Sequence, residues 1–209
     1  LDSRGMGNLF RHDRGQQRLR QIQRNNIERG IVFYTIPGNF DVARGSLAFW
    51  YKAPQRFPQG VSSESMIQGY RTNFNIQMYG SQNRMRFLTG TQHQDEFSWD
   101  YQCFASLSHI RPGQWNHIAI TWDRTSGQKQ IFINAERVGS NQTPLIRPKG
   151  GAQLALGMMR GGYDELGVWS RVLSAGEIAT LAEQPALLQQ AAEQIDTTDG
   201  ALPDWPDRK

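Results

Sequence analysis

The sequence predicts an all-β protein, a two-sheet antiparallel sandwich that ends in a short C-terminal helix. Short runs of alternating apolar and polar residues recur between turn-forming residues, and they are rich in β-branched and aromatic side chains. Hydrophobic residues make up only 38% of the 209-residue chain, whereas aromatic residues reach 11%. This combination favours a thin core of large rings between two sheets.

About nine or ten runs have the length and alternation of strands. Glycine, proline and other turn residues separate them at short intervals, which favours a sandwich over alternating strand–helix units. The predicted strands cover residues 31–36, 46–51, 66–67, 73–79, 84–88, 97–104, 117–122, 130–134, 152–156 and 163–169.

Only the end of the chain has helical character. Ser174 and Glu177 form a capping box, in which the serine caps free amides and the glutamate reaches back. Ile178 and Leu181 then share one helical face, and a second helical stretch starts at Pro185. We therefore divide the chain into a basic segment over residues 1–29, packed on the sandwich or part of it, a sandwich over 30–184, and a helical then flexible tail over 185–209.

Charge and cysteine content narrow the classes of partner. The formal charge is +4, and seven arginines fall within the first thirty residues. These could form a patch for nucleic acid, acidic glycans or anionic lipid, but their spacing favours an ordinary solvated segment, so no nucleic-acid partner is expected. The single cysteine, Cys103, excludes an internal disulfide and a multi-cysteine zinc site. With no membrane span or signal peptide visible and Leu1 at the start, we expect a trimmed fragment of an exported bacterial protein, in the periplasm, at the cell surface or outside.

Three segments carry a recognisable order. The first is the strand over residues 45–52, with Leu47, Phe49 and Tyr51 on one side. The second is a hairpin in which the run Trp-Asn-His-Ile-Ala-Ile-Thr-Trp-Asp, residues 115–123, turns at Ser126-Gly127 and returns through residues 129–134. The third contains Leu-Ala-Leu-Gly at 154–157, Tyr-Asp-Glu-Leu-Gly-Val-Trp at 163–169, and the capped helix.

This order resembles the laminin G-like, or concanavalin A-like, jelly-roll superfamily of the pentraxin type. The resemblance covers roughly residues 30–184, and the last of the three segments is the most specific. Ala135 departs from the pattern, because the family usually has glycine after the hairpin asparagine, and Tyr163 stands where an aliphatic residue usually precedes Asp-Glu. The resemblance implies a jelly-roll sandwich. The tryptophans at 50, 115, 122 and 169 and His117 are interpreted as packing residues.

Enzymes of the superfamily use closely spaced carboxylates on one strand, and the sequence has no such pattern. The nearest acidic group is Asp95, Glu96 and Asp100, and adjacent strand residues point to opposite faces. The four histidines lack zinc-type spacing, and no nucleophile or phosphate-binding motif is present. The sequence therefore predicts a protein with no catalytic residues, and it identifies no cofactor apart from the structural calcium ion considered below.

Alternation on three predicted strands places polar side chains on one outer face. Planar amide, guanidinium and carboxylate groups suit sugar hydroxyls, which need paired donation and acceptance. An ordinary solvated sheet face is the open alternative. The candidate ligand-binding residues are Asn73, Asn75, Gln77, Tyr79, Arg84, Arg86, Asp100 and Gln102.

The resemblance also implies one structural calcium ion near the last strand, held by Asp164 with backbone carbonyls. Calcium takes six to eight oxygen ligands, so Asp41 in the loop at 38–41 is the second candidate. The alternative is that Asp164 accepts hydrogen bonds from nearby amides or pairs with Arg171.

Three functions follow in order of preference. The first is a carbohydrate-binding module within a larger exported protein, the second a protein–protein adhesion or scaffold module, and the third a glycan-cleaving enzyme. The partner is thus a glycan or a surface protein, since fold alone does not decide function.

Overall fold

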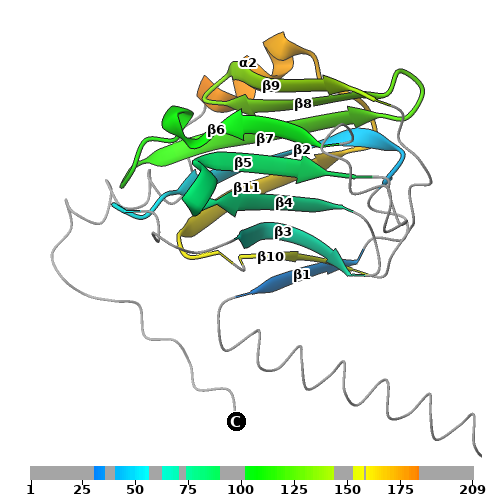
Figure 1. The fold of residues 1–209 in the computed structure, drawn as a ribbon. Helices are drawn as coiled ribbons and strands as arrows, with labels where there is room; N and C mark the ends of the chain where they lie inside the picture. Colours follow the sequence, from blue (N-terminus) through cyan, green and yellow to red (C-terminus); the bar gives the residue numbers. More distant parts are fainter. Residues whose placement is uncertain are drawn as a thin grey trace, which may run out of the picture.

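The computed structural model describes residues 31–35, 41–56, 63–70, 74–89, 102–143, 153–157 and 159–183. It confirms the antiparallel jelly-roll sandwich with a short C-terminal helix. Two sheets lie one against the other, and the helix lies beyond β8 and β9 (Figure 1). Sheet A has the order β1-β10-β3-β4-β5-β6 and sheet B the order β11-β2-β7-β8-β9.

The bounds of most elements follow the predicted runs closely, with one additional strand, whereas residues 97–101 of the predicted run 97–104 lie outside the described residues. They are β1 (Val32–Thr35), β2 (Arg44–Lys52), β3 (Glu64–Tyr70), β4 (Asn75–Tyr79), the 3-10 turn η1 (Gly80–Gln82), β5 (Arg84–Leu88), β6 (Cys103–Ser106), the 3-10 turn η4 (Leu107–His109), β7 (Trp115–Asp123), β8 (Gln128–Ile133), β9 (Glu136–Gln142), β10 (Gln153–Leu156), β11 (Gly162–Trp169) and α2 (Ala175–Glu183).

The inner faces of the two sheets form one hydrophobic core. Leu47, Phe49 and Tyr51 point inward from β2, and the inward residues of β7 and β8 lie beside them, as the hairpin pattern predicts. The Trp122 ring packs edge-on against Phe74, with 5.0 Å between the ring centres, so the core does contain large rings in contact. Burial of such rings supplies most of the stabilisation of a sandwich.

The tryptophans divide between the two sides of sheet B. Trp122 lies in the core, and its Nε1 donates to the Asp41 carbonyl oxygen at 3.1 Å. Trp169 packs with α2 against the outer face of the sheet. On that same face the Trp50 ring meets His117 at 5.4 Å, and His117 is buried as predicted.

The capping box starts α2, the only α-helix within the described ranges. The Ser174 hydroxyl accepts from the Glu177 amide at 3.2 Å, and Glu177 Oε2 accepts from the Ser174 amide at 2.8 Å. Ile178 is fully buried against the outer face of sheet B, which fixes the helix there. The segment from Pro185 and the basic segment at 1–29 lie outside the described residues.

Strand β9 is the element that the sequence did not predict. Asn134 and Ala135 both have positive φ angles, 52° and 69°, so they form the centre of a tight turn that reverses the chain after β8. The strand itself is polar, and only its Gly139 is buried. Ala135 therefore adopts the left-handed conformation that glycine would reach at lower cost.

Candidate functional site

The outer face of sheet A brings most of the predicted ligand-binding residues together. Strands β3, β4, β5 and β6 are neighbours, and their register aligns Ser65 with Gln77, Gln77 with Arg86, and Arg86 with Phe104. Ile76 and Met78 are buried on the other side of β4, so alternation leaves the polar residues of this strand facing out. We refer to this polar row, centred on Gln77 and Arg86, as the Arg86 face.

A hydrogen-bonded chain of side chains runs across the Arg86 face. Arg86 Nη1 donates to Gln102 Oε1 at 2.9 Å, and Arg86 Nη2 donates to Gln77 Oε1. The Gln77 amide nitrogen in turn donates to Ser65 Oγ at 3.2 Å. Tyr79 adds its hydroxyl, which donates to Gln77 Oε1 at 3.1 Å. These contacts hold the guanidinium and the amide in fixed orientations.

Two buried polar atoms of this face make no hydrogen bond. They are the Oδ1 acceptor of Asn75 and the Nε donor of Arg86. Buried polar groups are normally satisfied, so an unpaired donor and an unpaired acceptor close to a polar row indicate capacity for a ligand. Burial also lowers the pKa of Arg86 from its ordinary value.

A groove of about 320 Å³ adjoins this face at the edge of sheet A. Arg84 lines it, and its guanidinium carbon lies 5.8 Å from the centre of the Phe104 ring. Asn83, in the left-handed conformation, ends η1 and lets the chain enter β5. The remaining lining residues are Gln82, Ala105, Ser106 and Val138.

The structure places some of the predicted site residues on one face and does not describe others. Asn75, Gln77, Tyr79, Arg84 and Arg86 share the face, whereas Asn73 and Asp100 lie outside the described residues. Gln102 belongs to the network, but it is only 4% exposed and so is a support for Arg86 rather than an open surface residue. Sequence reasoning missed Ser65 and Phe104. Their positions are set by cross-strand register, for which the sequence carries no local signal.

The structure does not bring the two predicted calcium ligands together. Asp164 lies opposite Trp50 on β2, while Asp41 precedes Arg44 at the start of the same strand. Six residues separate Trp50 from Arg44, which corresponds to about 20 Å along a strand. One ion cannot contact both carboxylates at calcium–oxygen distances.

Each aspartate accepts a local amide hydrogen bond. Asp164 Oδ1 accepts from the Glu165 amide at 2.9 Å, and Asp41 Oδ1 accepts from the Ala43 amide at 2.8 Å. Arg171 pairs with Glu177, at 2.5 Å. Within the described ranges no group of three histidine, cysteine, aspartate or glutamate residues could hold a metal ion.

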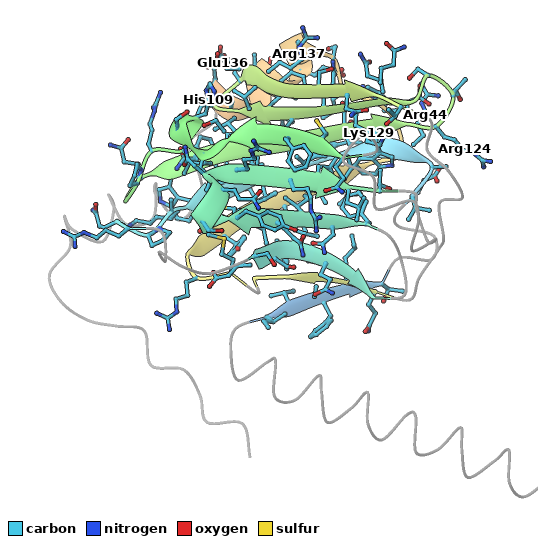
Figure 2. The ribbon with its side chains drawn as sticks, viewed as in Figure 1. Arg44, His109, Arg124, Lys129, Glu136 and Arg137 are labelled. Atoms are coloured by element: carbon cyan, nitrogen blue, oxygen red, sulfur yellow. The ribbon has the colours of Figure 1, made fainter. Side chains whose placement is uncertain are left out.

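Two side chains that could take part in catalysis, His117 and Cys103, are buried in the described part of the chain and have packing roles. Burial lowers the pKa of His117 to about 4 and raises the pKa of the Cys103 thiol to about 12, so the imidazole is neutral and the thiol protonated near neutral pH. His109 lies 3.6 Å from Glu136, away from the Arg86 face (Figure 2). No helix among the described residues is long and apolar enough to cross a membrane.

Together, the fold and the site define a jelly-roll domain with a polar, aromatic-lined outer face. Residues 30–179 match the concanavalin A-like lectin/glucanases superfamily in its laminin G-like branch, and the chain belongs to this family. Mouse neuronal pentraxin-2 is 30% identical over 89 residues, which cover 35% of this chain and 21% of that protein. The rat protein named for its Sushi, von Willebrand factor type A, EGF and pentraxin domains is 25% identical over 152 residues, which cover 65% of this chain and 4% of that protein.

Solved structures with the same fold include toxin domains. The binding domain of botulinum neurotoxin serotype D superposes with a TM-score of 0.55 at 14% identity, covering 73% of this chain and 40% of that one. The binding domain of botulinum neurotoxin DC in complex with SialylT gives a TM-score of 0.53 at 16% identity, covering 73% and 39%. The same domain in complex with rat synaptotagmin II gives 0.52 at 18% identity, with the same coverage. The chain thus spans about a fifth of the pentraxin and about two fifths of the toxin domains.

Proposed function

We propose that this domain is a non-catalytic carbohydrate-binding module and that the sugar binds on the Arg86 face. The observation that supports it most is the row of oriented planar groups, Gln77, Arg86 and Gln102, beside the Tyr79 ring. Such groups offer donors and acceptors in one plane, which matches the paired hydrogen bonding of adjacent sugar hydroxyls. The unpaired Asn75 Oδ1 would accept from one such hydroxyl.

The family assignment and a structural neighbour support the same proposal. The superfamily description includes lectins, and the neurotoxin domain that shares this fold was solved with SialylT. The described part of the Arg86 face contains no carboxylate, whereas glycoside cleavage needs an acid and a nucleophile or base. We therefore place the domain with the lectins of its superfamily rather than with the glucanases, as a module of a larger exported protein.

A panel of neutral and acidic oligosaccharides, tested by calorimetry against the 209-residue chain, examines the proposal. We expect at least one glycan to bind, and Gln77→Ala to weaken it at least tenfold. Arg124→Ala is the matched control, because Arg124 is exposed at the β7–β8 turn of sheet B (Figure 2). Binding unaffected by Gln77→Ala would move the site elsewhere, and release of reducing ends from any polysaccharide would contradict a non-catalytic role.

A protein-adhesion role is the second candidate, and a different region favours it. Val32 and Tyr34 on β1 and Val168 on β11 are exposed by 50%, 42% and 36%, and both strands are sheet edges. A groove of about 340 Å³ is lined by Val32 and Tyr34, by Leu156, Tyr163 and Leu166, and by the acidic residues Asp164 and Glu165. Exposed apolar side chains around a groove are typical of protein contacts. The neurotoxin domain solved with synaptotagmin II shows that this fold occurs in a protein-binding domain.

The two candidates are separable by substitutions at these two regions. Beads coated with the chain are tested for adhesion to cells before and after protease treatment of the cell surface. Protein adhesion predicts loss after protease and loss in Tyr34→Asp, with no change in Gln77→Ala. Glycan binding predicts that Gln77→Ala loses adhesion and that Tyr34→Asp retains it.

A further inference from the structure

Arg86 is the residue of the proposed binding face whose surroundings say most about the ligand. Both of its hydrogen-bond partners, Gln77 and Gln102, are neutral amides, and its third neighbour is the Tyr79 ring at 4.9 Å. No carboxylate among the described residues pairs with it, and the other charged residue of β5, Arg84, is itself a cation. Within the described residues, the half-buried guanidinium thus has no negatively charged partner.

Such a charge is costly to keep out of water. Arginine stays protonated at all physiological pH values, so the cost cannot be relieved by loss of the proton. Neutral hydrogen bonds offset part of it, and an anion in direct contact would offset more. If this side chain served only to stabilise the fold, an apolar side chain or an arginine paired with a carboxylate would have a smaller desolvation cost at this position.

The orientation of the guanidinium is also fixed, which favours binding of a planar group such as a carboxylate. One N–H of Nη1 and one of Nη2 are occupied by the glutamines, and Nε is buried without an acceptor. The remaining donors lie along the edges of the guanidinium, where a carboxylate can accept two parallel hydrogen bonds. Since the side chain is already fixed, little further rotamer entropy is lost on binding.

The surroundings add a second cation and an acceptor. Arg84 lies two residues away on the same face of β5, held over the Phe104 ring and exposed. Asn75 Oδ1, on β4, is a buried acceptor without a donor. A ligand that carries a carboxylate and hydroxyl groups on one rigid ring would satisfy all three features.

We propose that the glycan bound on this face is acidic and that Arg86 binds its sugar carboxylate through two parallel hydrogen bonds. This inference rests on the proposed function, since it names the class of sugar for the same site. Asn75 then accepts from a ring hydroxyl, and Arg84 contributes longer-range attraction.

Matched pairs of oligosaccharides test the carboxylate directly. The probes are a galacturonic acid hexamer and a mannuronic acid hexamer, each beside its carboxyl-reduced neutral form, with dextran sulfate as a sulfate-bearing arm. Calorimetry on the 209-residue chain is expected to show an acidic hexamer binding at least tenfold more tightly than its reduced form. Arg86→Lys and Arg86→Gln should each lose tenfold or more, because lysine keeps the charge but not the two-point geometry. Arg124→Gln, on sheet B, should bind as the wild type does.

The outcomes distinguish failure of the acidic-glycan inference from failure of the proposed carbohydrate-binding function. A reduced hexamer that binds as tightly as its acidic form, or an Arg86→Lys variant with full affinity, overturns the inference and leaves a glycan-binding module. Dextran sulfate that binds as tightly as the uronic acid hexamers also overturns it, because the carboxylate is then not the group recognised. Absence of binding to every acidic and neutral glycan overturns the proposed function as well. If the Arg86 variants do not fold, the acidic–reduced comparison on the wild-type chain still decides.

Discussion

The guanidinium carbon of Arg86 lies 4.9 Å from the centre of the Tyr79 ring, with the two residues on neighbouring strands of sheet A. A cation over an aromatic face contributes about 0.5–2 kcal/mol, with the larger values where the pair is desolvated. Tyr79 also fixes Gln77, the amide that orients Arg86. Tyr79 therefore contributes both to the stability of this face and to the orientation of the groups proposed to bind the sugar.

The first prediction concerns that coupling. Tyr79→Leu and Arg86→Gln, made singly and together, should show a coupling of about 0.5–2 kcal/mol in the free energy of unfolding by urea. Tyr79→Phe, which keeps the ring and removes only the hydroxyl, should retain most of it. Strictly additive effects of the two changes would show that the ring and the guanidinium do not interact.

The second prediction concerns the core behind this face. Phe87 is fully buried and packs against Phe74 at 5.2 Å, so Phe87→Ala should destabilise the domain by about 3–5 kcal/mol. Arg124→Ala on the surface should change stability by less than about 0.5 kcal/mol. Thermal or urea unfolding measures both, and a loss below about 1 kcal/mol for Phe87→Ala would contradict the described packing.

Strands β4 and β5 show what the sequence can predict. Their alternation identified both the buried side, with Ile76 and Met78, and the polar side, with Gln77 and Arg86, because a period of two fixes which residues share a face. The resemblance to the laminin G-like family identified the same sandwich independently. The polar side of each of these two strands could therefore be identified from local pattern alone.

The features that could not be predicted from the sequence depend on contacts between residues that are far apart in the chain. β9 is polar and follows a turn whose second residue is Ala135 rather than glycine, so neither strand nor turn signal is strong. Asp41 and Asp164 were grouped as calcium ligands, yet the register of β11 on β2 places them far apart. The burial of Gln102 likewise arises from tertiary surroundings that no local pattern encodes.

The third prediction concerns the turn before β9. Ala135 has a φ of 69°, a conformation that costs an L-residue about 1–2 kcal/mol. Ala135→Gly should remove that strain, and the gain is partly offset by the greater freedom of glycine in the unfolded chain. We expect a net stabilisation of about 0.5–1 kcal/mol in urea unfolding. Ala119→Gly, in the middle of β7, is the contrasting change and should destabilise.

The fourth prediction concerns acid. Burial lowers the pKa of His117 to about 4, below the value of about 6.5 that it has in the unfolded chain. The unfolded state then binds the proton first as pH falls, so stability contributed by the neutral imidazole is complete above pH 6.5 and is lost towards pH 4. The loss should reach about 3 kcal/mol across that window.

The slope of the unfolding free energy against pH checks this point. His117→Gln should flatten the slope of the unfolding free energy between pH 6.5 and 4. Equal slopes in the wild type and His117→Gln would place the acid sensitivity elsewhere. Glu177 acts in a lower window, because its hydrogen bonds to Arg171 and Ser174 lower its pKa from 4.5 to about 2, so the stability that its carboxylate contributes is lost between about pH 4.5 and pH 2.

The last prediction concerns calcium. The resemblance to the superfamily implies an ion at Asp164, but the register removes Asp41 from reach, and one oxygen of Asp164 already accepts from the Glu165 amide. Calcium needs six to eight oxygen ligands, and a single carboxylate supplies at most two of them. The Arg86 face, for its part, offers amide oxygens and cations, and two arginines oppose a divalent cation there. We therefore expect glycan binding and the melting temperature to be the same with calcium and with a chelator.

Thermal melts of the wild type and of Asp164→Asn, each with calcium and with a chelator, decide the matter. An ion bound to the folded state at 100 times its dissociation constant would add about 2.7 kcal/mol, which raises the melting temperature by several degrees. A calcium-dependent rise in the wild type that disappears in Asp164→Asn would contradict our expectation. It would show that backbone carbonyls near β11 complete the coordination of Asp164. A rise that persists in Asp164→Asn would place the ion at another site, and Asp41→Asn would then be the next variant to melt.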